Sequence, residues 1–206
     1  MTIRLHAGDL PKGFDLGPIV AIDTETMGLE VGRDRLCVVQ LSCGDGTAEV
    51  VQIAPGQTRA PNLEALLADA SVLKLFHFGR FDIAMMCHAF GVMAGPVYCT
   101  KIASKIARTY TDRHGLKDLT RELLGVEISK QQQSSDWGAE ALSEAQLTYA
   151  ASDVLHLHAL REKLDAMLKR EGRDALASAA FAYLPERARL DLAGFAAVDI
   201  FAHASP

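Results

Sequence analysis

The 206-residue sequence contains few cysteines, few aromatic residues and no long apolar segment. No apolar run approaches the ~18 residues that a membrane-spanning helix needs. The opening segment MTIRLHAGDLPKGF also lacks the apolar centre of a signal peptide. We therefore expect a cytoplasmic protein with no membrane partner. With 49% hydrophobic and 23% charged residues, the composition excludes a disordered, collagen-like or coiled-coil chain and fits one globular domain.

The cysteines and histidines show none of the usual metal-binding spacings. The four cysteines form no CxxC pair, and the seven histidines form no HExxH motif. A zinc site is therefore not expected. The thiols are predicted to be reduced, in the core or near the surface: Cys37, Cys43, Cys87 and Cys99.

The chain has fewer basic than acidic residues, with 21 Lys and Arg against 26 Asp and Glu, which gives a net charge of -5. Such a chain is a poor general binder of nucleic-acid backbones. The segment from Lys101 to Lys130 is the exception, with seven basic and four acidic residues, so 7 − 4 gives a local +3 and leaves -8 elsewhere. A small basic patch suits a ligand with few phosphates, although these cations can also form an ordinary solvated helix face. The basic residues are Lys101, Lys105, Arg108, Arg113, Lys117, Arg121 and Lys130.

The first part of the chain has the alternation that is typical of strands. The patterns predict strands at Ile19 to Thr26, at Leu36 to Cys43 and, after an Asp-Gly turn, at Ala48 to Ile53. Short connections between the three predict an antiparallel meander. Leucines at helical spacing follow Pro55, and Leu73 to Phe78 then has the pattern of a buried strand. Strands and helices that follow one another in this way predict an α/β fold, with a mixed sheet flanked by helices.

The second half is predicted to be mostly helical. Ser143 and Gln146 have the spacing of a capping box at the start of a long helical stretch that Gly172 ends. Asp174 to Tyr183 and Pro185 to Leu192 are predicted to be two shorter helices.

Two acidic residues, Asp23 and Glu25, share one face of the first strand. Side chains two apart on a strand lie within ~7 Å of each other, so these carboxylates would repel unless a cation lies between them. An alternative is that the two acids merely cap the turn at Gly28.

Asp82 follows a predicted strand at a turn through Gly79, where α/β sheets place their ligands. We expect the following helix N-terminus to keep its carboxylate ionised, and an Asp that only complements the helix dipole is the alternative. Tyr149 and Asp153 are four apart on a helix, so a phenol lies over a carboxylate, unless the two simply form a solvated pair.

Taken together, these motifs supply four carboxylates and a phenol that can meet at one end of a sheet. An all-oxygen cluster selects hard cations such as Mg²⁺ or Mn²⁺. Two such ions about 4 Å apart suit phosphoryl chemistry.

These motifs resemble, in the same order, the three exonuclease motifs of the DEDD superfamily. They are DTETMGL from Asp23, then Phe81-Asp82, then Tyr149-x-x-x-Asp153. Tyrosine four residues before the last aspartate is typical of the DEDDy branch, since the histidine branch would have His where Thr148 stands. Over roughly Ile19 to Leu168 the sequence is similar to the ribonuclease D family. The further motifs that resemble this family are GLKDL from Gly115, Ser129-Lys130 followed by QSSDW from Gln133, and LSxxQxxYA from Leu142.

The resemblance implies an RNase H-like fold and one 3′-5′ exonuclease domain over residues 1–206, with a core of about 19–170 and a helical C-terminal extension of about 174–206. It implies metal-dependent release of nucleoside 5′-monophosphates from a 3′ end. Asp23, Glu25, Asp82 and Asp153 would hold two ions, Mg²⁺ or Mn²⁺. Tyr149 would orient the attacking water, because a phenol with a pKa near 10 is a poor base at neutral pH.

Residues on the substrate side are implied in the same way. Leu29 resembles the apolar wedge that separates terminal bases, and the expected substrate contacts are Thr24, Leu29, His77 and Lys117. The second motif commonly has asparagine where this chain has Phe78, so one hydrogen bond near the 3′ terminus is in question.

The C-terminal tail is similar to that of the compact nanoRNase C group, whose members act on short oligonucleotides as ring-shaped homo-oligomers. Longer ribonuclease D proteins carry HRDC modules, for which this chain is too short. We therefore expect short RNA, or single-stranded DNA, as substrate and a homo-oligomer, although the apolar tail can also pack on the domain's own core. The competing functions are a stand-alone ribonuclease D that trims tRNA 3′ ends, a non-catalytic nucleic-acid-binding relative, and a metal-stabilised α/β protein.

Overall fold

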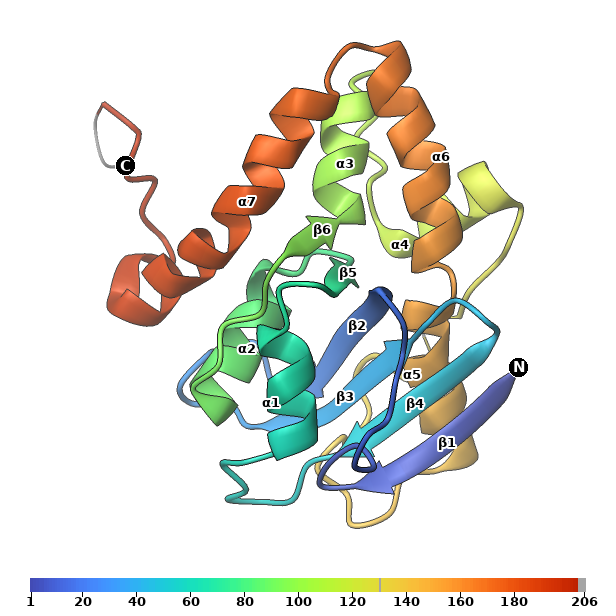
Figure 1. Ribbon diagram of the computed structural model, residues 1–206, viewed down its shortest axis with the longest axis vertical. Helices are drawn as coiled ribbons and strands as arrows, with labels where there is room; N and C mark the ends of the chain where they lie inside the picture. The colour runs from blue at the N-terminus through green and yellow to red at the C-terminus, as the bar shows by residue number, and fades with distance from the viewer. Residues whose placement is uncertain (130, 204–206) are drawn as a thin grey trace.

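Six strands form one mixed sheet in the spatial order β1-β4-β3-β2-β5-β6 (Figure 1). The structure, a computed structural model, describes residues 1–129 and 131–203. β2 pairs antiparallel with β3, and β3 with β4, so the predicted meander is confirmed. The other neighbouring pairs are parallel. The strands are β1 (Thr2–Ala7), β2 (Ile19–Thr26), β3 (Leu36–Ser42), β4 (Thr47–Gln52), β5 (Leu73–Phe76) and β6 (Val97–Cys99).

Helices cover both faces of this sheet. Figure 1 shows α5 behind the strands and α1 in front of them. Val38 and Val50 pack with Ala150 of α5 and with Trp137 in a small core of their own. The helices are α1 (Pro61–Ala68), α2 (Arg80–Phe90), α3 (Thr100–Ala107), α4 (Leu116–Leu119), α5 (Glu144–Leu155), α6 (Leu157–Arg170) and α7 (Asp174–Leu190), with π-helical turns η1 (Thr120–Leu124) and η2 (Asp191–Phe195).

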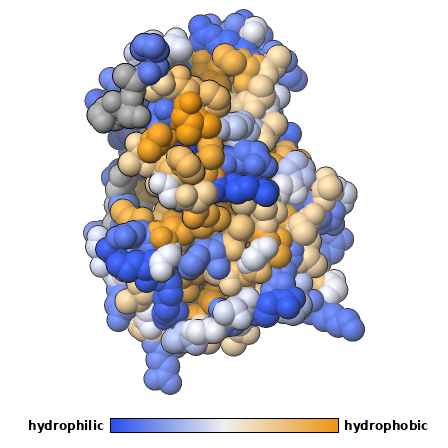
Figure 2. Space-filling view, turned by 90° about the vertical axis from the view of Figure 1, so that its left-hand side faces the viewer, coloured by the Kyte–Doolittle hydropathy of each residue, from blue (hydrophilic) through white to orange (hydrophobic). Residues whose placement is uncertain are grey.

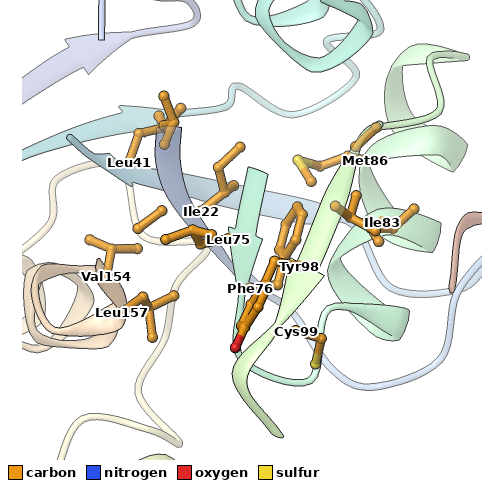
Figure 3. Packing of buried hydrophobic residues seen from close by; sticks show 14 of the residues in the cluster. Ile22, Leu41, Leu75, Phe76, Ile83, Met86, Tyr98, Cys99, Val154 and Leu157 are labelled. Atoms are coloured by element: carbon orange, nitrogen blue, oxygen red, sulfur yellow. The ribbon is translucent and has the colours of Figure 1, made fainter. Parts of the chain in front are cut away.

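The main core fixes the strands that carry the acidic motifs. In Figure 3 the side chains of Ile22, Leu75 and Tyr98 come from β2, β5 and β6 and pack near Ile83 and Met86 of α2. The same core continues to Val154 and Leu157, at the junction of α5 and α6. β2, α2 and α5 are therefore anchored to one another through one set of buried side chains.

The edge strands β1 and β6 were not predicted. β1 has no buried residue and is joined to β4 by a parallel ladder and by contacts with Glu49, since Arg4 Nη1 lies 2.7 Å from Glu49 Oε1 and His6 Nε2 lies 2.6 Å from Glu49 Oε2. Its apolar residues Ile3, Leu5 and Ala7 do alternate with polar ones, so the sequence carried a strand signal that was overlooked, although none of these side chains is buried. β6 has only three residues, which is too short for a periodic signal.

The C-terminal helices differ from the prediction in two places. The long helical stretch is divided at His156 into α5 and α6, and it ends at Arg170, just before Gly172 with its φ of 65°, as predicted. The two short helices are instead one helix, α7, which runs through Pro185. Proline removes one backbone donor and usually breaks a helix interior. Here the helix continues, because Phe181, Leu184 and Ala188 on both sides of Pro185 are buried in the main core.

The capping box at the start of α5 forms as predicted. Gln146 N donates to Ser143 Oγ, and Ser143 N donates to Gln146 Oε1 at 2.9 Å. The four cysteines are free thiols, with Cys37 and Cys99 buried. In the part of the chain that the structure describes, no helix has both the length and the apolar character to cross a membrane.

In the second half of α7 and beyond it the chain exposes several large apolar side chains, which we call the C-terminal apolar cluster. Figure 2, which faces the C-terminal end of α7, shows hydrophobic side chains gathered on this surface. The ring centroids of two members, Tyr183 and Phe201, lie 5.9 Å apart. Residues 204–206, the end of the extension expected from the sequence, lie outside the described residues. The cluster consists of Tyr183, Phe195, Val198, Ile200 and Phe201.

Candidate active site

The acidic residues of the first motif project from β2 toward α5. Asp23 pairs with Gln40 of β3, and strand alternation puts Asp23 and Glu25 on the same face of β2. Asp153 reaches them from α5. One carboxylate oxygen from each of Asp23, Glu25 and Asp153 lies within 4.8 Å of the others. The structure therefore brings together three of the four carboxylates that the sequence predicted to meet.

The electrostatics of this group favour a cation. Burial raises the pKa of Asp23 well above its ordinary value, and the charges of Asp82 and Asp153 raise it further. Burial together with Asp153 raises the pKa of Glu25 to about 9. Without a cation Glu25 therefore holds its proton at neutral pH and the charged form of Asp23 is disfavoured, whereas a cation would favour the charged forms of both. An all-oxygen set of this kind fits Mg²⁺ or Mn²⁺, which take carboxylate ligands.

Asp82 is not one of these three carboxylates, but its charge acts on Asp23. It is in the first turn of α2, is 4% exposed, and accepts a hydrogen bond of 2.6 Å from Thr24 Oγ1. Thr24 alternates with Asp23 and Glu25 and therefore projects from the opposite face of the strand. Asp82 is still close enough for its charge to raise the pKa of Glu25.

The expectation that the helix N-terminus keeps Asp82 ionised was wrong. Burial raises the pKa of Asp82 to about 7, although hydrogen bonds from Thr24 and from backbone N–H groups oppose the shift. The desolvation cost of the carboxylate outweighs the helix dipole. An Asp that only complements the dipole would keep a low pKa, so the structure does not favour that alternative.

Tyr149 lies one turn before Asp153 on α5, and its phenol hydrogen-bonds to the Asp153 carboxylate. Burial raises the pKa of Tyr149 above its ordinary value, and the charges of Asp153 and Glu25 add to the effect. Its ring packs 6.0 Å from that of Trp137. The phenol therefore stays protonated at neutral pH, and the pair is part of the acidic site and not a solvated helix surface.

The loop after β2 carries Leu29, which is 85% exposed. Other residues make this turn: Thr26 Oγ1 donates to the Gly28 carbonyl, and Asp34 Oδ2 accepts from Glu30 N at 3.0 Å. A Cβ on Gly28 would lie 2.2 Å from Asp34 Oδ2, so glycine is required at this close approach. In the structure the turn is thus closed by side chains other than Asp23 and Glu25.

The strand β5 ends at Phe76, so His77 and Phe78 form a turn and do not continue the strand as predicted. Phe78 has a φ of 65°, in the left-handed region that asparagine tolerates better than phenylalanine. Lys101 Nζ lies 4.3 Å from the centroid of the Phe78 ring. His77 Nδ1 lies 2.9 Å from Thr100 Oγ1, and burial lowers the pKa of His77 to about 3, so the ring is neutral.

The basic segment supplies fewer available cations than the sequence count predicted. Arg108 is buried and contacts Glu122, and Arg121 Nη2 lies 2.7 Å from Asp118 Oδ1. Lys117 is half-buried on α4. Lys130, which belongs to this segment and to the ribonuclease D motif, lies outside the described residues.

Sequence reasoning missed Gln40. Its Nε2 donates to Asp23 Oδ2 at 3.1 Å, from a position directly across the β2–β3 ladder. The available signal was the presence of one amide in the middle of a largely apolar strand, LCVVQLS, because a fully buried polar side chain requires a partner.

A mixed sheet with an acidic cluster between its central strand and a covering helix defines a nuclease of the RNase H-like class. The chain belongs to the 3′-5′ exonuclease family, whose profile matches residues 11–169.

Known relatives agree with this assignment. Ribonuclease D of Gluconacetobacter diazotrophicus is 40% identical over 156 residues, which cover 76% of this chain and 39% of that protein. The structure of Brucella melitensis NrnC bound to pGG is 62% identical, with a TM-score of 0.96, and covers 99% of this chain and 100% of that one. NrnC has also been solved with bound Mg²⁺, at 61% identity and a TM-score of 0.96, with the same coverage.

Escherichia coli RNase D has the same fold, at 27% identity and a TM-score of 0.75, over 84% of this chain and 45% of that one. The chain thus spans about two fifths of the length of the curated ribonuclease D relative and the full length of NrnC. The expected mixed sheet flanked by helices and the expected ribonuclease D-like 3′-5′ exonuclease are confirmed.

Proposed function

We propose that this protein is a divalent-metal-dependent 3′-5′ exoribonuclease that releases nucleoside 5′-monophosphates from short oligoribonucleotides. The observation that carries the proposal is the group of three carboxylates whose oxygens lie within 4.8 Å of one another. Like charges are costly at such distances unless a cation neutralises them. NrnC, which is similar over its full length, has been solved with Mg²⁺.

Asp23, Glu25 and Asp153 would hold one ion. Asp82 would help to hold a second ion next to Asp23, since its charge already acts on that carboxylate. Divalent ions held there would activate water and stabilise charge at the phosphate. The protein's own contribution is to keep the four carboxylates in place from one rigid strand and two helices.

Tyr149 would position the water that attacks phosphorus. Its phenol stays protonated, so it acts as a hydrogen-bond donor or acceptor and not as a general base. Because Tyr149 also hydrogen-bonds to Asp153, it would hold this water close to the carboxylates.

On the substrate side, exposed Leu29 would separate the terminal bases, and Lys117 would contact a phosphate. Neutral His77 would offer a hydrogen bond without charge. The hydroxyl of Thr24 donates to Asp82, so we propose that Thr24 acts mainly by orienting that carboxylate.

The function can be tested with purified protein and end-labelled oligonucleotides of RNA and DNA, each with Mg²⁺, Mn²⁺ or EDTA. The proposal expects stepwise shortening from the 3′ end with either ion, release of 5′-monophosphates, and no cleavage in EDTA. Binding without shortening would favour a non-catalytic relative. An absence of both binding and cleavage would favour a metal-stabilised α/β protein.

Substrate length separates the short-RNA proposal from a ribonuclease D that trims tRNA ends. Each cation that contacts a distant phosphate adds affinity for long chains, with a salt slope of about -0.7 per phosphate neutralised on single strands. Two arginines of the basic segment, Arg108 and Arg121, are instead paired with acids. NrnC in complex with pGG also supports a short ligand.

We expect kcat/KM to be highest on oligoribonucleotides of a few nucleotides and not to rise with the length of the 3′ single strand. The measurement compares a dinucleotide, a pentamer and a twenty-mer of one sequence at two salt concentrations. A steep gain with length and strong salt sensitivity would instead support the tRNA-trimming function.

We also propose that the chain forms a homo-oligomer, with a ring as the expected arrangement, through the C-terminal apolar cluster. Part of the tail packs on the domain's own core, because Phe181 and Leu184 are buried there. The cluster itself stays exposed, and Phe201 is 76% accessible. Association would remove these side chains from water.

Light scattering at micromolar concentration should give a mass above that of the 22.2 kDa monomer. The double variant Phe195→Ser with Phe201→Ser should lower the mass. Leu176→Ser is the matched control, since Leu176 is exposed at the other end of α7 and should leave the mass unchanged. A monomeric parent would contradict the proposal.

We also propose that the protein resides in the cytoplasm, because its four free thiols fit a reducing compartment.

A further inference from the structure

Gln40 is a fully buried amide in the middle of the sheet. Every residue of β3 is buried, and Gln40 is 0% exposed. It pairs with Asp23 of β2 on one side and with Val50 of β4 on the other. A buried amide without good hydrogen bonds costs on the order of 1–3 kcal/mol, so an apolar residue would serve the fold better at this position.

The two ends of this amide have different surroundings. Nε2 donates to Asp23 Oδ2 at 3.1 Å, and a hydrogen bond from Gln40 also reaches Glu25. Oε1 is buried and accepts no hydrogen bond from any residue that the structure describes. The side chain is therefore oriented so that its amide N–H group faces the two carboxylates of β2, while its amide oxygen has no hydrogen-bond donor among the described residues.

The chemistry of an amide suits this place. A Lys or Arg here would also bind the carboxylates, but its positive charge would compete with a cation. A neutral N–H group fixes the direction of a carboxylate and leaves its negative charge for an ion. The strand that carries Gln40 is also paired on both sides, which makes it a rigid support.

We propose that Gln40 is a positioning residue that holds Asp23 and Glu25 in the orientation in which their remaining oxygens face Asp153. The inference rests on the proposed function in one respect, namely that this group binds divalent ions. Partners that orient metal ligands typically change metal affinity by about 10- to 100-fold when they are removed. The two carboxylates would thus already have their metal-binding orientation before the ion binds.

Calorimetric titration of the full chain with Mn²⁺ alone tests this inference without any activity measurement. Gln40→Met keeps the length of the side chain and removes both polar atoms, and it is expected to weaken Mn²⁺ binding by about 10- to 100-fold. The Mn²⁺ concentration that gives half-maximal cleavage should rise by the same factor. Gln40→Asn, which keeps the amide but shortens its reach, should weaken binding to a smaller degree.

Ser42→Ala is the matched control. Ser42 lies two residues further along the same strand face, is equally buried, and donates from Oγ to the Thr47 carbonyl at 2.7 Å. Its Oγ also accepts from Gly44 N at 3.2 Å, so the substitution removes two hydrogen bonds, neither of which involves the carboxylates. We expect Ser42→Ala to melt at a lower temperature but to bind Mn²⁺ like the parent.

The outcomes separate the two proposals. If the parent binds no Mn²⁺, the proposed function fails. If the parent binds Mn²⁺ and Gln40→Met binds it equally well while melting earlier, then Gln40 is only a structural amide and the inference is overturned. Should Gln40→Met fail to fold, Gln40→Asn decides: parent-like Mn²⁺ affinity in that variant overturns the inference, and weaker binding supports it.

Discussion

Asp82→Asn is expected to lower cleavage at saturating Mg²⁺ by on the order of 10³-fold or more while the protein stays folded. The substitution removes a charge that helps to hold the ions, and metal ions supply several kcal/mol of transition-state stabilisation. It keeps the shape of the side chain, and the amide oxygen can still accept the hydrogen bond from Thr24 Oγ1. Single-turnover rates on an end-labelled oligonucleotide give the effect, with circular dichroism as the check on folding.

The same variant should melt slightly higher than the parent in EDTA at pH 8. Burial raises the folded-state pKa of Asp82 to about 7, from an ordinary value of 3.8. The folded parent therefore binds more protons than the unfolded chain between about pH 4 and pH 7, so its stability falls as pH rises through this window. Asparagine has no such dependence.

The difference in melting temperature between the two proteins should therefore close as the pH falls toward 4. Saturating Mg²⁺ should also remove the parent's disadvantage, because an ion compensates the buried charge. Parent-like turnover of Asp82→Asn at saturating Mg²⁺ would refute the assignment of Asp82 to the metal site. A melting difference that does not depend on pH would mean that charge is not its cause.

The local parts of the fold were predictable because they depend on local patterns. Side chains alternate between the two faces of the strand that carries Asp23 and Glu25, and the capping box of Ser143 and Gln146 lies within four consecutive residues. In β1 the apolar Ile3, Leu5 and Ala7 also alternate with polar residues, but this strand was missed. Its place at the edge beside β4, with Arg4 and His6 contacting Glu49, follows only from the assembled sheet. The continuity of α7 through Pro185 depends on tertiary burial, which overrides the local cost of proline.

The functional site likewise combines features that local sequence predicts with features that only the assembled fold determines. The order and spacing of the motifs identified the carboxylates and the phenol, whereas the contacts among them depend on register and burial. Gln40 meets Asp23 only because β2 and β3 pair in one register. The pKa of Asp82 depends on how deeply α2 buries its first turn, and Arg108 was counted as a surface cation although the fold buries it. Desolvation and pairing of this kind follow from the assembled chain and not from local sequence.

Tyr149→Phe and Asp153→Asn are one turn apart on α5 and should nevertheless fail in different ways. Tyr149→Phe is expected to slow cleavage on the order of 10²-fold, because it removes the hydroxyl that positions water. Its ring can still pack against Trp137, so the fold around it should be kept. Its Mn²⁺ affinity should stay close to that of the parent, since the phenol is protonated and is not proposed as a ligand.

Asp153→Asn removes one of the three carboxylates that lie within 4.8 Å of one another, and it should lose both cleavage and tight Mn²⁺ binding. The comparison uses cleavage rates over a range of Mn²⁺ concentrations and calorimetric Mn²⁺ affinity, measured on both variants and on the parent. Raising the Mn²⁺ concentration should recover part of the rate of Asp153→Asn and none of the rate lost in Tyr149→Phe, because only the former is limited by ion occupancy. Equal loss of rate and of metal binding in the two variants would show that the phenol and the carboxylate act as one ligand unit, and the separate roles proposed for them would be wrong.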